Sequence, residues 1–193
     1  MGYDFRSDQI LGPAFDYWQA KRGARVMPRR CDIDPTEIPA RLLPNLQLTE
    51  LIDGGARIRY RLTGTAIVNA YGADLTGKYF DEVFSGRRLD YVKANYRMVC
   101  SERRPLLVCN PYVSARNVKL ICTRLVMPLS DDDMNVNQCL TAMSFHFPHE
   151  AAQWCDEWFG NKSYLDVANS YDVASSYSEI VSDRPGEHGR LIT

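Results

Sequence analysis

Long apolar runs are absent from this sequence, and no stretch approaches the roughly 20 residues of a membrane-spanning helix. The first ten residues, MGYDFRSDQI, lack the basic and then apolar order of a secretion signal. Arg6 stands where N-myristoylation needs Ser or Thr. An excess of one charge is also lacking, because 23 Lys and Arg oppose 24 Asp and Glu. We therefore expect a cytoplasmic protein with no membrane or nucleic-acid partner, although a local charged patch is compatible with this balance.

Closely spaced cysteines are absent too. The six cysteines stand at positions 31, 100, 109, 122, 139 and 155, too far apart for a C-x-x-C redox motif or a zinc knuckle. We expect reduced, partly buried core residues, with one reactive thiol as the alternative. His146 and His149 form an H-x-x-H, but Pro148 breaks the helix that this spacing needs. We interpret them as ordinary histidines at a strand end and expect no metal site.

A phosphate-binding loop is nearly present. Residues 72–79 read GADLTGKY, which matches G-x-x-x-x-G-K-[ST] until Tyr79. The residues before Gly72 predict a helix, whereas such a loop must follow a buried strand. Tyr79 also cannot bind Mg²⁺ as the Ser or Thr hydroxyl would. We therefore interpret the segment as a turn in which Gly72 ends one short helix, Asp74 caps the next and Gly77 lets the chain turn.

Two helical segments are expected before the first strand. Leu11, Phe15 and Trp18 form an apolar stripe at helical spacing, which ends at Gly23. The stripe either packs on its own domain or pairs with a second copy of the chain. The next segment, DIDPTEIPARLLPNLQL, predicts a short helix that Asp34 and Glu37 cap and Pro44 ends.

Alternating side chains then indicate strands. Residues 46–52 and 57–62 flank Asp53-Gly54-Gly55 and predict an antiparallel hairpin with one buried face. We expect the buried face of its second strand to carry Ile58, Tyr60 and Leu62, and its open face to carry Arg57, Arg59 and Arg61. The arginine face is either only solvated or binds an acidic partner.

Helices and further strands follow the hairpin. Residues 65–72 and 75–84 predict short helices, 87–101 a longer one, and 105–113, 118–129 and 136–147 three strands. Pro128 indicates a strand end or an edge strand. This order predicts an α+β fold in which five antiparallel strands carry short helices on one face. We divide the chain into N-terminal flanking helices (1–45), a core (46–147), and a C-terminal helix with a partly disordered tail (148–193), whose final ten or so residues we expect to be disordered.

Aromatic residues gather between the second expected strand and the long helix. They form either an aromatic core or a ligand pocket between the sheet and the short helices. The residues that we expect to line such a pocket are Tyr60, Leu62, Ile67, Tyr71, Phe80, Phe84, Tyr96, Leu120 and Cys122.

Several short motifs occur together along the chain. They are W-x-x-K-R-G at 18–23, P-x-R at 28–30, D-x-D-P-x-E-x-P at 32–39, L-L-P at 42–44, R-Y-R-L-x-G-T at 59–65, Y-G-x-D-L-T-G-K at 71–78 and L-x-M-P-L-S at 125–130. Over residues 15–147 the chain resembles the bacterial family of small stand-alone PAS domain proteins, which is mostly alphaproteobacterial. The resemblance implies a PAS fold with a pocket between one sheet face and the short helices, and a sensory or regulatory role without catalytic residues.

Two PAS subclasses are disfavoured by what the sequence lacks. It has no G-x-N-C-R-F motif of flavin photoreceptors, and residues 87–101 contain no histidine for a heme. We expect no cofactor, and leave open a small-molecule ligand of unknown identity. We expect a regulator that forms a homodimer and binds an unknown signalling protein, through a surface of Leu11, Phe15, Trp18, Arg57, Arg59 and Arg61. The alternative is a small enzyme that uses the same pocket with an acidic general base.

Overall fold

One antiparallel sheet organises the protein. The computed structural model describes residues 4–147 and 189–192. The strands are β1 (Leu46–Ile52), β2 (Arg57–Thr63), β3 (Leu106–Val113), β4 (Lys119–Leu129), β5 (Gln138–His146) and β6 (Gly189–Leu191). Their order across the sheet is β2-β1-β5-β4-β3-β6, and every neighbouring pair is antiparallel. The α+β prediction is confirmed, with six strands in place of five.

The additional strand comes from the segment that we expected to be disordered. Gly189–Leu191 pair with residues 106–108 of β3, so the disorder prediction is wrong for these three residues. Without them the start of β3 would be an open edge, whose unpaired backbone groups readily accept another strand. The remaining predictions for residues 148–193, including the C-terminal helix, lie outside the described residues.

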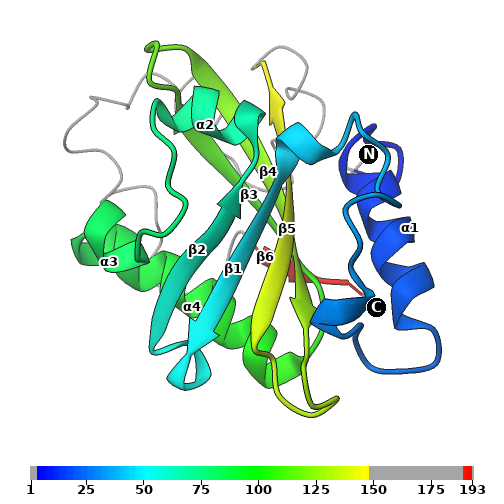
Figure 1. Cartoon of the computed structure of the whole chain (residues 1–193). Helices are drawn as coiled ribbons and strands as arrows, with labels where there is room; N and C mark the ends of the chain where they lie inside the picture. The colour runs from blue at the N-terminus through cyan, green and yellow to red at the C-terminus, as the bar shows by residue number, and fades with distance from the viewer. Residues whose placement is uncertain (1–3, 148–188, 193) are drawn as a thin grey trace.

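Four α-helices accompany the sheet in the described ranges, on opposite sides of it (Figure 1). They are α1 (Leu11–Arg22), α2 (Thr65–Tyr71), α3 (Phe80–Val83) and α4 (Gly86–Glu102). We call the face that α2, α3 and α4 cover the inner face, and the opposite one, where α1 lies, the outer face. The ends predicted for α1 and α2 are confirmed, since Gly23 and Gly72 both have positive φ (57° and 75°).

The helix predicted around residues 34–44 is wrong. This segment forms turns and a short 3₁₀ helix, Leu43–Asn45. The expected capping box does not form, because the backbone N–H of Asp34 donates to the Tyr17 hydroxyl (3.0 Å) and Glu37 pairs with Lys21. Pro39 has no N–H to continue a helix. Contacts with α1 therefore replace the local capping pattern.

The apolar stripe of α1 is buried within its own chain. Leu11, Phe15 and Trp18 are each at most 1% exposed. The indole N–H of Trp18 donates to the carbonyl of Pro128 at 2.9 Å, which attaches α1 to the end of β4. The prediction that this stripe is a partner or dimer surface is wrong, and the alternative of packing on its own domain is correct.

A β-bulge determines which residues of β2 reach which face. Leu48 pairs with Leu62 but Thr49 pairs with Tyr60, so Arg61 is an extra residue in β2. Side chains alternate along a strand, and one extra residue reverses the faces of all that follow. Tyr60 therefore faces the inner side while Leu62 faces the outer side.

The glycine-rich segment that resembled a phosphate loop covers the free edge of β2. Tyr60 N–H donates to the Lys78 carbonyl (2.9 Å), and Gly77 N–H donates to the Tyr60 carbonyl (2.8 Å). Gly77 has φ 87°, a conformation that favours glycine. Asp74 accepts from the backbone N–H of Thr76, so it caps a turn rather than the next helix. Helix α2 precedes the segment, as predicted from the sequence.

Candidate functional site

The predicted pocket residues form two clusters on the inner face. Phe80 is at the centre of the first, with its ring 4.5 Å from Tyr60, 5.9 Å from Phe84 and 5.2 Å from Tyr96. Ile67 and Cys122 belong to the second, and Tyr71 packs against it. These rings and aliphatic groups supply the apolar part of a candidate site.

Two of the predicted pocket residues do not belong to these clusters. Leu62 lies on the outer face because of the bulge at Arg61, so its assignment to the pocket is wrong. Leu120 is two residues from Cys122 along β4 and faces the same side, but it is only half-buried at the end of the sheet. Whether the clustered residues bind a ligand stays a prediction.

Polar side chains that we did not predict also lie on the inner face. The Tyr91 hydroxyl of α4 accepts from Asn110 Nδ2 of β3 (3.1 Å), and Asn110 Oδ1 accepts from Arg124 of β4 (2.7 Å). Near Tyr96, Gln47 Nε2 of β1 approaches the hydroxyl at 3.5 Å. Burial raises the pKa of the Tyr96 hydroxyl, and its polar neighbours Thr141 and Thr49 oppose that rise. A polar network therefore joins α4 to β1, β3 and β4.

Oγ1 of Thr141 is buried without a hydrogen-bond partner among the described residues. So are two further atoms of this region, Oδ1 of Asn95 and Nε of Arg124. Asn95 lies one helical turn after Tyr91, so both side chains point toward the sheet. Oδ1 of Asn95 accepts a hydrogen bond and Nε of Arg124 donates one. The region therefore has unused capacity of both kinds.

The sequence contained a signal for this network that we interpreted differently. Gln47 and Thr49 alternate with Leu46 and Leu48 in the hairpin for which we predicted one buried face. In the structure both residues are at most 2% exposed, because helices and loops cover both faces of β1. Polar residues on a strand covered on both sides are the feature that would have indicated the site.

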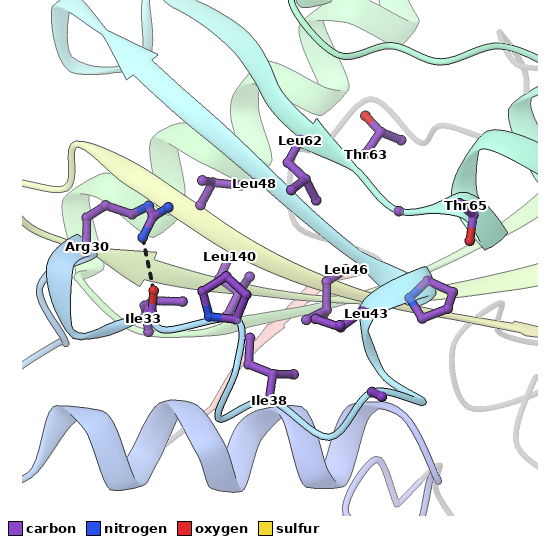
Figure 2. A pocket seen from close by; sticks show the side chains of 14 residues that line it. Arg30, Ile33, Ile38, Leu43, Leu46, Leu48, Leu62, Thr63, Thr65 and Leu140 are labelled. Atoms are coloured by element: carbon purple, nitrogen blue, oxygen red, sulfur yellow. Dashed lines mark hydrogen bonds between the residues drawn. The ribbon is translucent and has the colours of Figure 1, made fainter.

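A groove on the outer face is the second candidate (Figure 2). Its volume is about 440 Å³, and it lies between the sheet and the segment around residues 30–44. Leu48, Leu62 and Leu140 from the sheet lie across from Ile33 and Ile38 in Figure 2. Two leucines on its lining stay exposed, Leu62 at 48% and Leu43 at 37%. The groove is large enough for a ligand or an inserted side chain.

The arginines of β2 are mostly engaged within the chain. Arg57 pairs with Asp81 (3.2 Å) and lies 3.6 Å from the ring centre of Tyr79. Arg59 pairs with Glu50 across the hairpin at 2.6 Å. Arg61, the bulge residue, is exposed. Of the three arginines, only Arg61 forms no ion pair with another described residue, and the role of this surface with a partner stays a prediction.

Reactive groups are few among the described residues. Burial raises the pKa of the Cys100 and Cys122 thiols to about 11 and that of Cys139 well above its usual value, as expected of core cysteines. Cys31 is exposed. His146 faces Asp8 at 3.3 Å, and the described ranges contain no cluster of three potential metal ligands. His149 and Cys155 lie outside those ranges.

The pKa values of several carboxylic acids are lowered. Hydrogen bonds from Asn135 and Met134 lower that of Asp132, and Arg29 lowers that of Asp133. Shifts are also downward at Asp32, Asp34 and Asp74, mainly through backbone or side-chain hydrogen bonds. All five are therefore ionised at neutral pH.

No helix in the described part of the chain has the length and apolar character needed to span a bilayer.

Comparison with known proteins identifies a family. Residues 8–144 match the PAS domain family. No curated protein matches the chain. Among solved structures, the LOV protein of Rhodobacter sphaeroides is similar, with a TM-score of 0.41 and 12% identity over 65% of this chain and 64% of that one. The chain thus spans less than two thirds of that protein.

Two further solved structures resemble the chain to a similar degree. A variant of the same LOV protein has a TM-score of 0.40 and 12% identity, covering 65% of each chain. A fungal LOV domain photoreceptor has a TM-score of 0.37 and 11% identity over 58% of this chain and 79% of that one. These likenesses are too weak to support an argument about ligands.

Proposed function

Because the chain belongs to the PAS domain family, we propose that it is a sensory module that binds a small molecule at the inner face and signals through contact with another protein. The observation that carries this proposal is the pair of buried atoms without partners, Asn95 Oδ1 and Arg124 Nε. A buried polar atom left without a hydrogen bond costs about 1–3 kcal/mol of stability. Ligand binding therefore explains the presence of these unpaired atoms better than a role in folding does.

The two atoms define the chemistry of the ligand. Asn95 Oδ1 needs a donor, and Arg124 Nε needs an acceptor, for which an anionic oxygen is the strongest choice. Tyr60, Tyr91 and Tyr96 supply aromatic surface on the same side of the sheet. The best fit is therefore a small planar molecule that carries both an N–H and a carbonyl or carboxylate oxygen.

The alternative of a small enzyme gains no support from the described residues. An acidic general base that works near neutral pH needs a raised pKa. Every described carboxylate whose pKa is clearly shifted has it lowered, for example Asp32, Asp74 and Asp133. Ligand sensing accounts for the buried polar network without requiring such a base.

A thermal-shift screen of small heterocycles tests ligand binding. A ligand at 100 times its Kd stabilises the folded state by about 2.7 kcal/mol, which corresponds to about 5–10 °C in Tm for a chain of this size. We expect one or more compounds to raise the Tm of the wild type and of Asn69→Leu, but not of Asn95→Leu. Asn69 is exposed on α2 and provides the same substitution away from the site. Equal shifts in all three proteins, or none in any, would contradict the proposal.

We assign the contact with the partner protein to the outer groove. Exposed apolar side chains that cluster around a hollow are typical of protein contacts, and Leu43 and Leu62 have this arrangement. The partner, whether a signalling protein or a second copy of the chain, would insert apolar side chains there. This surface replaces α1, whose stripe is buried.

Substitution at the groove tests the partner assignment. We expect Leu62→Lys to lose a protein that the wild type retains in affinity capture from its native cell. Val118→Lys is the matched control, because Val118 is 39% exposed in the turn between β3 and β4. Retention of the same protein by Leu62→Lys, or its loss from both variants, would remove the groove as the contact surface.

A further inference from the structure

Four arginines line a second cavity, of about 390 Å³. It lies where the end of α1, the turn after it and the connection from α4 to β3 meet. Its lining contains Arg22, Arg25, Arg103 and Arg104, with Trp18 beside them, and no carboxylate among the described residues. The chain as a whole carries a net charge of −1, so this positive patch is local.

Two of the four arginines have partners within the protein. Arg25 donates to the carbonyl of Lys21 (2.8 Å) and pairs with Asp32. Arg104 donates to the carbonyl of Ile192 (3.4 Å), which attaches the residue after β6 to this corner. Basic residues often satisfy the free carbonyls at helix ends, as Arg25 does at the end of α1. The positions of Arg25 and Arg104 are thus explained by the fold.

The fold does not explain the positions of the other two arginines. Nε of Arg22 is buried and has no acceptor among the described residues, although its guanidinium lies 5.7 Å from the Trp18 ring. Arg103 is exposed and forms no ion pair with a described residue. It ends α4 in the left-handed conformation (φ 54°), a position where glycine is usual. Keeping an arginine there costs about 1 kcal/mol relative to glycine.

We propose that this cavity binds a small soluble compound that carries two or more phosphate groups. Arginine presents several N–H donors in a planar fork that matches phosphate oxygens. A phosphate in the cavity would pair with the guanidinium of Arg22, which lines it and has no carboxylate partner among the described residues, and a second phosphate would lie within reach of the Arg103 side chain. The site lies on the opposite side of the sheet from the ligand of the proposed sensory function and does not depend on it.

Calorimetric titration of the whole chain with inorganic pyrophosphate tests this site. We expect saturable binding to the wild type, weakened at least tenfold by Arg103→Gly and by Arg22→Met. Glycine suits the backbone at position 103, so that variant keeps its fold while it loses the charge. Arg116→Ala is the control, because Arg116 is exposed in the turn between β3 and β4 and its removal changes the net charge equally.

The outcomes distinguish a specific binding site from nonspecific electrostatic attraction. No saturable binding by the wild type, or equal weakening in all three variants, would overturn the proposal. Cosedimentation with phosphatidylglycerol vesicles distinguishes a lipid head group from a soluble compound, and vesicle binding that pyrophosphate does not displace would also overturn it. Asn95→Leu is expected to bind pyrophosphate as the wild type does, so this site and the inner-face site fail or succeed separately.

Discussion

Asn95→Leu should make the ligand-free protein more stable. Asn95 is 3% exposed on the face of α4 that packs against the sheet, and its Oδ1 has no partner among the described residues. Leucine branches at the same carbon as asparagine and fills nearly the same space. The substitution therefore removes the whole side-chain amide, with its unsatisfied carbonyl, and leaves the packing of α4 nearly unchanged.

The size of the effect follows from three contributions. Removing an unsatisfied buried carbonyl gains about 1–3 kcal/mol, and leucine exceeds asparagine in helix propensity by a few tenths of a kcal/mol. The slightly larger side chain gives back part of this gain. We expect a net increase of about 1–2 kcal/mol in the free energy of unfolding, or about 2–8 °C in Tm.

Urea unfolding followed by tryptophan fluorescence measures this change. Both proteins are first unfolded and refolded, so that bound small molecules are removed and do not stabilise the wild type. The dependence on urea should be unchanged, since the same surface is exposed on unfolding. If Asn95→Leu is instead less stable by 1 kcal/mol or more, its carbonyl has a structural partner and the inner-face network belongs to the fold.

Two further predictions concern the core. Trp18→Ala should lower the free energy of unfolding by about 3–5 kcal/mol, because Trp18 is buried and its indole bonds to Pro128; a loss below 1 kcal/mol in urea unfolding would show that α1 is peripheral. The thiol of Cys122 has its pKa raised from 9.0 to about 11 by burial, so its contribution to stability is complete below pH 9 and declines as pH rises to 11. This decline is about 1.4 kcal/mol per pH unit. Cys122→Val should make the slope shallower by that amount, while Cys100 and Cys139 keep their own contributions; the same slope in both proteins would contradict this assignment.

Local patterns predicted most of the secondary structure. The hairpin, α4 and the three later strands follow from hydrophobic periodicity and turn residues, which act over a few neighbouring positions. The helix predicted around Asp34 does not form, because contacts with a distant part of the chain determine its structure. Its capping residues bond to Tyr17 and Lys21 on α1, and no local pattern contains those contacts.

The candidate site was predicted only in its apolar part. Tyr60, Phe80, Phe84 and Tyr96 gather as expected, because large aromatic residues on these elements have only the core to pack in. Leu62 was misplaced because the bulge at Arg61 leaves no mark in the alternation of the strand. The burial of Gln47 and Thr49 could not be predicted, because the structure that covers β1 comes from distant parts of the chain.

Native mass spectrometry of the chain purified from its own cell tests whether a ligand is bound at the inner face. We expect the wild type to carry a bound small molecule, so that its mass exceeds that of its polypeptide, and Asn95→Leu to have the mass of its polypeptide alone. If each protein has only the mass of its own polypeptide, ligand sensing at the inner face is contradicted.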